Sequence, residues 1–157
     1  MQVLDLPPAS KYAVSTEQVI EALVLQCQAP VLARRNLYLQ FVVAWLTGNG
    51  DLHGKNVSIL ADEHGRFSVA PIYDIPCTLI YGDDTMALTI AGKTKNLKKR
   101  HWVELAKLLG LADRAAHSAN QLALKAASTV DLRELPFDGS PLHGAQRELR
   151  FRHMELQ

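Results

Sequence analysis

The chain has 157 residues, 48% of them hydrophobic, and a formal net charge of +1, which suits one ordinary domain with a sizeable buried core. The near-neutral charge disfavours a globally basic nucleic-acid binder, and 21% charged residues disfavour general disorder. Cys27 and Cys77 have neither disulfide-framework nor metal-ligand spacing, and neither a signal sequence nor a long apolar run is present, so we expect a cytoplasmic protein that does not enter a membrane.

Two helices are predicted after an entering loop over residues 1–14. Ser15, with Gln18 three residues later, has the pattern of a capping box and predicts a helix over 16–27. A second helix is predicted over 31–47, and its second half is apolar nearly all round. We therefore expect that helix to be buried.

The middle of the chain predicts a small sheet. Residues 56–70 alternate apolar and polar side chains on both sides of a turn at His64 and Gly65, which is typical of a β-hairpin. Residues 86–92 are a candidate further strand. Residues 93–100, KTKNLKKR, are expected to form a solvated basic loop, with contact to an acidic partner, nucleic acid or a phosphorylated segment as the alternative.

Helices are predicted again in the last third of the chain. The segment HWVELAKLLGL is amphipathic, and its glycine stands where a helix ends. Asp113 is a candidate cap for a helix over 114–129, residues 131–142 look like a linker, and a final basic helix is expected over 144–155. The fold class predicted is therefore mainly α with a small β-hairpin or sheet.

A polar loop, TGNGDLHGKN, stands between the buried helix and the hairpin. Because a hairpin brings its two ends together, we expect Asn56 and Asp74 to be neighbours in space. Two oxygens from such a pair suit a hard cation such as Mg²⁺, whose other ligands would be phosphate and water. Asp51 is then available to position or deprotonate a hydroxyl group, and Lys55 could offset charge on a transferring phosphoryl group.

This spacing is the layout of protein-kinase-like phosphoryl transfer. In those enzymes the catalytic loop runs Asp-x-x-x-x-Asn, and a metal-binding Asp follows. The loop here is DLHGKN, with the same spacing. Asp74 is followed by Ile75 and Pro76, so the usual Phe-Gly is absent.

The stretches GNGDLHGKNVSIL, GRFSVAPIYDIP and IAGK resemble the C-terminal lobe of HipA-type serine/threonine kinases, the toxins of bacterial toxin–antitoxin pairs. The family motif is close to G-N-x-D-x-H-x-K-N followed by L-x-P-x-Y-D, and only its Leu differs here, as Val69. The resemblance runs from about Lys11 to Gly110. It implies a HipA-like C-terminal kinase lobe, of protein-kinase-like fold, over 15–130, followed by a linker and terminal helix over 131–157.

The resemblance also implies roles for single residues. Asp51 would be the catalytic base, Asn56 and Asp74 the ligands of Mg²⁺ bound with ATP, and His53 and Lys55 would line the active loop near the nucleotide phosphates. The implied reaction is phosphoryl transfer from ATP to a protein serine or threonine during growth arrest. The implied target is a translation protein such as an aminoacyl-tRNA synthetase, and the implied restraint is a HipB-like DNA-binding antitoxin.

The first part of the chain departs from the family. Family members carry an N-terminal lobe with a Gly-rich phosphate-covering loop and an anchoring lysine, but residues 1–46 hold no glycine, and Lys11 is the only lysine before Lys55. We therefore expect the N-lobe to come from another chain, and the isolated chain to be inactive and to bind Mg·ATP poorly. The alternatives are a truncated, inactive remnant that acts as a protein-binding module and, less favoured by the charge, a nucleic-acid binder that uses 93–100.

Ordinary structural roles compete with these functional ones. Asp51 could cap a turn, and Asn56 could satisfy the end of a strand. His53 is as readily explained by packing against the hairpin as by chemistry. Tyr73 and the two tryptophans are most simply explained as core residues.

Overall fold

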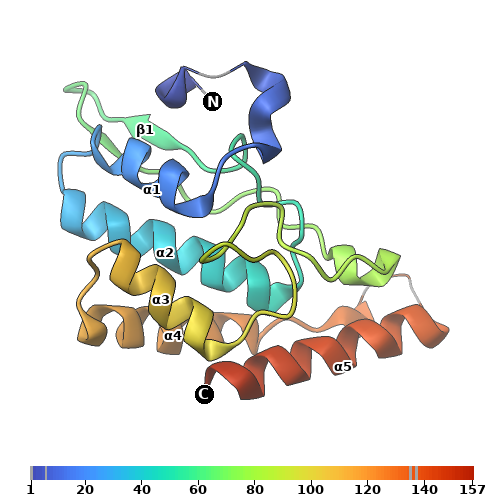
Figure 1. The fold of residues 1–157 in the computed structure, drawn as a ribbon. Helices are drawn as coiled ribbons and strands as arrows, with labels where there is room; N and C mark the ends of the chain where they lie inside the picture. The colour runs from blue at the N-terminus through green and yellow to red at the C-terminus, as the bar shows by residue number, and fades with distance from the viewer. Residues whose placement is uncertain (1, 6, 135, 137) are drawn as a thin grey trace.

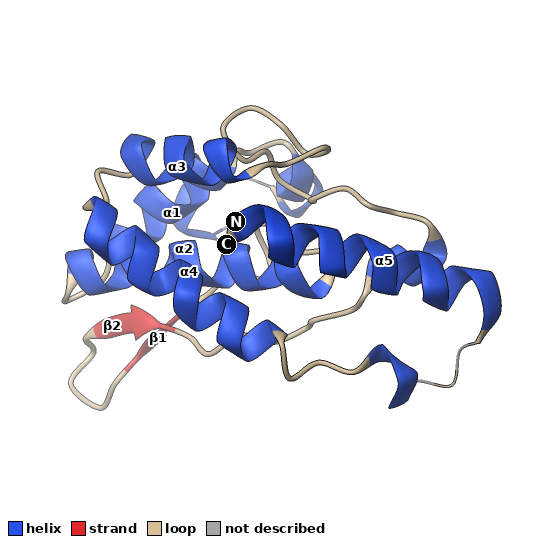
Figure 2. Ribbon diagram, turned by 90° about the horizontal axis from the view of Figure 1, so that it is seen from below, coloured by secondary structure: helices blue, strands red, loops and turns tan. Residues whose placement is uncertain are grey.

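The computed structural model describes residues 2–5, 7–134, 136 and 138–157, and it confirms the mainly helical fold with one small antiparallel sheet (Figures 1 and 2). The helices and strands are η1 (Gln2–Leu4), η2 (Pro8–Tyr12), α1 (Thr16–Val24), α2 (Pro30–Thr47), β1 (Ile59–Ala61), β2 (Phe67–Val69), η3 (Thr78–Tyr81), α3 (Lys99–Leu108), α4 (Asp113–Ala127), η4 (Leu132–Glu134) and α5 (Gly139–Leu156), where η marks a short 3₁₀ helix. Among the residues described, no helix is both long and apolar enough to cross a bilayer.

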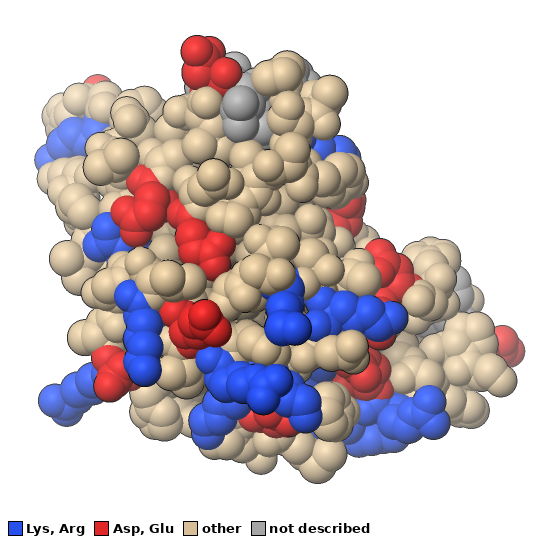
Figure 3. All heavy atoms as spheres, viewed as in Figure 1, with Lys and Arg blue, Asp and Glu red and all other residues tan. Residues whose placement is uncertain are grey.

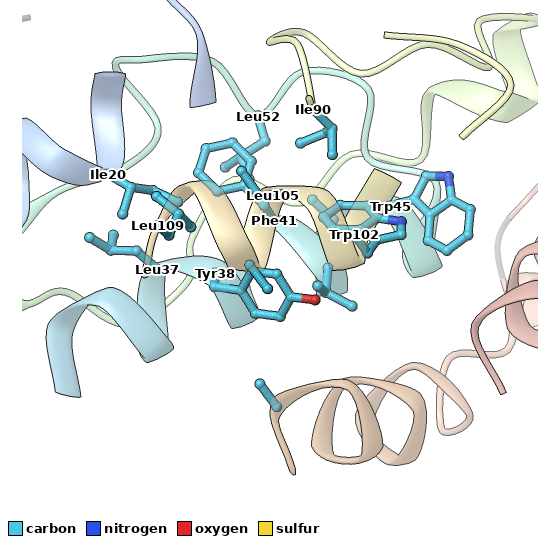
Figure 4. Close-up of a cluster of buried hydrophobic side chains, with 14 of the residues drawn as sticks. Ile20, Leu37, Tyr38, Phe41, Trp45, Leu52, Ile90, Trp102, Leu105 and Leu109 are labelled. Carbon is cyan, nitrogen blue, oxygen red and sulfur yellow. The ribbon is translucent and has the colours of Figure 1, made fainter. Parts of the chain in front are cut away.

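The core is built around α2, as its apolar sequence predicted. Tyr38, Phe41 and Trp45 of α2 are buried, and they face Trp102 and Leu105 of α3 (Figure 4). The rings of Trp45 and Trp102 lie 5.4 Å apart, which confirms that both tryptophans are core residues. Burying a side chain of this size stabilises the fold by about 1.5–3 kcal/mol, so α2 is the rigid element on which the following loop is mounted.

The hairpin forms in the predicted place, at one edge of the helical body (Figure 2). In its register Ile59 faces Val69, and Ala61 faces Phe67. The carboxylate of Asp62 accepts hydrogen bonds from two backbone N–H groups of the turn, at 2.9 Å each. This tight turn brings the chain back toward its own start, where the polar loop ends.

The strand predicted over 86–92 is not formed. In the described part of the chain the one β-bridge of this segment is the isolated one between Ile90 and Lys93. Met86, Leu88 and Ile90 are nevertheless buried, while the residues between them are half-buried. The alternation was therefore real, but it reports an irregular segment with bends and a turn that packs every second side chain of 86–90 on the core.

Three helix boundaries differ from the predictions. The capping box of Ser15 is present, but α1 ends at Val24, because the backbone N–H of Gln28 already bonds to the hairpin at Phe67. The N-cap of α4 is Ala112, which makes no side-chain hydrogen bond, so Asp113 is the first helical residue and not the cap. The negative charge of Asp113 in the first turn stabilises the helix through the helix dipole. The last helix begins at residue 139, so residues 139–142 of the linker expected over 131–142 are helical.

Helix α5 runs along the base of the molecule and caps the end of α2 (Figure 1). Arg152, 2% exposed, donates to the backbone oxygens of Trp45 at 2.9 Å and Asp84 at 2.8 Å, and it pairs with Glu148 at 2.9 Å. A ring nitrogen of His153 lies 3.2 Å from the oxygen of Leu46. Side chains of α5 thus contact the carbonyls of Trp45 and Leu46 in the last turn of α2, in addition to the bond that Trp45 accepts from the N–H of Gly48 at 3.3 Å.

We expect Arg152→Ala to lower the free energy of unfolding by about 1–3 kcal/mol, because it removes the buried donor that joins the backbone oxygens of Trp45 and Asp84 and leaves Glu148 without its partner. Urea denaturation followed by circular dichroism measures the loss. Arg150→Ala, on an exposed position of the same helix, is the matched control and should change stability by no more than about 0.5 kcal/mol. Equal effects of the two substitutions would contradict this role of Arg152.

Candidate active site

The polar loop begins with two glycines that the fold requires. Gly48 ends α2 in the left-handed conformation, with φ of +74°, and a β-carbon there would lie 2.7 Å from a methyl carbon of Leu79. Gly50 donates its N–H to the hydroxyl of Thr78 at 3.0 Å, and a β-carbon at this position would collide with that same oxygen. The loop is therefore pressed against the segment around η3.

The structure brings Asn56 and Asp74 together, as the hairpin predicted. The side-chain nitrogen of Asn56 donates to Oδ2 of Asp74 at 2.8 Å and to the backbone oxygen of Asp51 at 3.1 Å. Both partners are acceptors, so the amide must present its NH₂ group to them and turn its own oxygen, Oδ1, the other way. One side chain thereby joins the Asp51 backbone to the Asp74 carboxylate while keeping an oxygen for a ligand.

Asn49 plays a second joining role that sequence reasoning missed. Its Oδ1 accepts from the N–H of Asp51 at 2.9 Å, and its Nδ2 donates to the backbone oxygen of Asp74 at 3.1 Å. No role was predicted for Asn49 from the sequence. Its place in the G-N-x-D motif, two positions before Asp51, was the signal that could have indicated this contact.

Asp74 lies in the left-handed region with φ of +54°, which is unusual for a residue with a side chain. Such a conformation costs of order 1–3 kcal/mol and persists only where surrounding contacts require it. Asn49 holds the carbonyl of Asp74, and Asn56 holds its carboxylate. These two bonds are the contacts that keep the exposed Asp74 turned toward the loop.

His53 packs on the N-terminal segment rather than on the hairpin. It is buried, its ring meets that of Tyr12 edge to face at 5.2 Å, and its Nε2 lies 2.8 Å from the Lys11 ammonium. An ammonium only donates, so Nε2 must accept and the ring proton belongs on Nδ1. Because Nε2 then carries no proton, its 3.8 Å approach to Asp51 is not an ion pair. The Lys55 N–H lies 3.4 Å from Nδ1, a longer contact than that of the Lys11 ammonium, so it does not change this assignment of the ring proton.

Tyr73 is not a core residue, contrary to the simplest expectation. It is 41% exposed, and its hydroxyl donates to the backbone oxygen of Lys55 at 2.9 Å and lies 2.6 Å from the hydroxyl of Ser58. It therefore ties the end of the loop to the strand that follows. The exposed Lys55 side chain makes no hydrogen bond or ion pair to the rest of the described chain, so its ammonium can face an outside anion.

A cavity of about 520 Å³ opens beside Asp51. Tyr12, Asp51, Thr78 and Asp83 are among the residues that line it, whereas Asn56 and Asp74 are not. Hydrogen bonds from the Thr85 hydroxyl and backbone N–H hold the pKa of Asp83 below its usual value, so this carboxylate is charged at neutral pH. Asp51 thus lines the cavity and is also bonded, through its backbone oxygen, to Asn56 of the Asn56–Asp74 pair.

The Asn56–Asp74 pair fits a Mg²⁺ ion that is shared with a phosphate group. Within the described residues, no three His, Cys, Asp or Glu side chains gather closely enough to hold a metal by themselves. A cation here would need outside oxygens, and Mg²⁺ commonly takes one or two protein oxygens and completes its octahedron with phosphate and water. Oδ1 of Asn56 and the carboxylate of Asp74 are the oxygens available for it.

The basic segment 93–100 is neutralised in part by acidic side chains of the same chain. Lys95 pairs with Asp84 at 2.9 Å, and Lys99 donates to the backbone oxygen of Gln157 at 2.9 Å. Figure 3 shows lysine and arginine side chains interspersed with acidic ones over this face. This arrangement favours the solvated, structural interpretation of the segment over nucleic-acid binding.

Comparison with known proteins identifies the family to which the chain belongs. The family model of the HipA-like C-terminal domain matches residues 1–130. The chain belongs to this family. The matched range of the HipA-like domain is wider than the motifs that suggested it, and it includes the segment that carries Lys11 and Tyr12.

Curated relatives of this HipA-like chain are named as kinases. "Putative kinase Y4mE" of Sinorhizobium fredii is 34% identical over 119 residues, 70% of this chain and 28% of the relative. "Putative kinase Y4dM" of the same organism is 31% identical over 114 residues, 71% of this chain and 27% of the relative. The chain therefore spans little more than a quarter of the length of these proteins.

A solved structure has the same fold. The HipA-like chain matches a chain of the Shewanella oneidensis toxin–antitoxin complex of HipA, HipB and operator DNA, with a TM-score of 0.69 and 24% identity. The match covers 89% of this chain and 35% of that one. At this identity the likeness establishes the fold, including the kinase-like arrangement of helices and hairpin.

We expect Gly50→Ala to destabilise the protein by about 1–3 kcal/mol, because the added methyl group collides with Thr78 and with the backbone oxygen of Thr85. Gly144→Ala is the matched control: a β-carbon there meets nothing within 4 Å, and alanine favours a helix interior over glycine by about 1 kcal/mol. Thermal unfolding compares the two variants. A loop that tolerated Gly50→Ala would not be pressed against η3 as described.

Proposed function

We propose that this chain carries the catalytic loop of a HipA-like kinase that transfers the γ-phosphoryl group of ATP to a serine or threonine of a protein. The observation that supports this most strongly is the 2.8 Å bond between Asn56 and Asp74, five and twenty-three positions after Asp51. In the proposed arrangement one region, the Asn56–Asp74 pair, supplies the ligand oxygens, and a second region, the cavity that Asp51 lines, receives the acceptor. A phosphoryl group held by the first region would meet a hydroxyl group held in the second.

Each residue of the loop then has a role. The Asp51 carboxylate accepts the proton of the acceptor hydroxyl, which general-base catalysis requires within hydrogen-bond reach. Asn56 and Asp74 hold Mg²⁺, which when bound neutralises negative charge on the ATP phosphates. The free ammonium of Lys55 adds positive charge for the transferring group. His53 orders the loop through its contact with Lys11.

The rest of the nucleotide site is proposed to lie on a separate lobe. Residues 1–46 contain no glycine-rich stretch that could cover phosphates, and the chain spans 28% of the kinase relative Y4mE. In the proposed enzyme an N-terminal lobe supplies the phosphate-covering loop and the anchoring lysine. The isolated C-terminal lobe accordingly binds Mg·ATP weakly.

The proposed setting is bacterial growth arrest in the cytoplasm. The Shewanella HipA structure includes HipB and operator DNA, which supports a HipB-like DNA-binding antitoxin as the partner of this chain. The proposed substrate is a protein of translation, such as an aminoacyl-tRNA synthetase. Co-purification with the product of a neighbouring helix-turn-helix gene would test the partner separately from the chemistry.

A second candidate function is a non-catalytic binding module. An apolar cavity of about 390 Å³ opens at the start of α2, where Val31 and Leu32 are 75% and 55% exposed. Such a surface is typical of protein contacts. Under this alternative the loop is inherited from a kinase but performs no chemistry.

We expect Asp51→Asn to lower phosphoryl transfer by the complete protein at least about 100-fold, because the amide cannot accept the hydroxyl proton. Transfer of labelled phosphate from ATP to protein, with growth arrest in cells, measures the effect. Asp113→Asn, exposed at the start of α4, is the control and should leave both unchanged. Growth arrest that survives Asp51→Asn would favour the binding module.

We expect Asp74→Asn to weaken the Mg²⁺-dependent part of ATP binding by about tenfold or more, since one charged ligand of the proposed ion is lost. Calorimetric titration of the complete protein with ATP, with and without Mg²⁺, isolates that part. Affinity for metal-free ATP should stay the same. A variant in which Mg²⁺ strengthens ATP binding as much as in the parent protein would remove Asp74 from the proposed ligand set.

A further inference from the structure

The end of η2 contacts the candidate catalytic loop although the two are distant in sequence. The hydroxyl of Tyr12 donates to Oδ1 of Asp51 at 3.1 Å, across 39 positions. The backbone oxygen of Lys11 accepts from the N–H of Gly54 at 3.2 Å. Neither contact has a part in the roles assigned so far, and Tyr12 also lines the cavity beside Asp51.

We propose that Tyr12 is a positioning residue for Asp51, whose hydroxyl holds Oδ1 and so directs Oδ2 toward an acceptor hydroxyl in the cavity. The proposal rests on the proposed function, in which Asp51 accepts the proton of that hydroxyl. It adds a residue from outside the loop to the machinery of transfer. It also gives the segment before α1 a part in the site.

The Asp51 backbone is already fixed, so only its side chain remains to be ordered. Asn49 accepts from its N–H, and Asn56 donates to its oxygen. The side chain itself is 42% exposed, and an exposed carboxylate samples several rotamers unless a bond selects one. Within the described residues, Tyr12 is the one group that donates a hydrogen bond to this carboxylate.

Tyr12 is itself held in place through its ring. The ring packs edge to face on His53 at 5.2 Å, and the Lys11 ammonium lies 4.6 Å from its centroid. That ammonium is anchored by Nε2 of His53 at 2.8 Å. Because the ring contacts do not involve the hydroxyl, Tyr12→Phe removes the bond to Asp51 and keeps the packing, whereas Tyr12→Ala removes both.

The direct test is the side-chain rotamer of Asp51, measured by NMR on this chain through three-bond couplings from its α-proton to its β-protons. We expect couplings of one rotamer in the parent chain and averaged couplings in Tyr12→Phe, with the unfolding midpoint and the side-chain amide signals of Asn56 unchanged. Tyr73→Phe is the matched control, because it also removes an exposed hydroxyl bonded to the loop, and it should leave the Asp51 couplings as they are. Unchanged Asp51 couplings in Tyr12→Phe would overturn the proposal.

A second measurement uses phosphoryl transfer by the complete protein. We expect Tyr12→Phe to lower kcat about tenfold with the KM for ATP unchanged, and to cause no further loss in an Asp51→Asn background. A full additional loss in that background would overturn the positioning role. If the couplings of Asp51 average as expected but the parent protein transfers no phosphoryl group, the positioning of Asp51 by Tyr12 stands and the proposed function fails.

Discussion

The site depends on one constraint: the Asp74 carboxylate must be held against the loop by a backbone conformation that residues with side chains rarely adopt. A left-handed φ of +54° persists only when its surroundings leave no easier alternative. Asn56 and Asn49 provide those surroundings, one from each end of the loop. Because both also bond to the backbone of Asp51, the same two amides fix the distance between the two acidic residues.

The hydrogen bonds of Asn49 and Asn56 hold Asp51 and Asp74 in place only if the loop itself starts from a rigid element. The loop leaves α2 at Gly48, and a helix end frays where its last carbonyls lack partners. Arg152 and His153 of α5 reach the oxygens of Trp45 and Leu46, so the final turn of α2 is tied down from outside the helix. The terminal helix lies beyond the range matched by the family model, yet it sets the position from which the loop starts.

The sequence predicted those parts of the site that local patterns determine. The hairpin alternation and its turn were enough to place Asn56 beside Asp74, since a hairpin closes on itself whatever surrounds it. The contacts of Lys11 and Tyr12 could not be predicted, because no period or motif links segments about forty positions apart and only the folded core brings them together. The strand prediction for residues 86–92 was wrong for another reason. Alternation indicates that every second side chain is buried, and it does not indicate whether a neighbouring strand exists.

Asn49 and Asn56 use their side-chain amides differently, and this difference explains why residue 56 is Asn and not Asp. Asn49 spends both polar atoms on internal bonds, whereas Asn56 uses only its nitrogen. A carboxylate at 56 would set an acceptor oxygen against the Asp74 carboxylate and the Asp51 carbonyl, and it would repel both until a cation arrived. The amide donates to these groups and still presents an oxygen, so the candidate metal site can be ordered before any ligand binds.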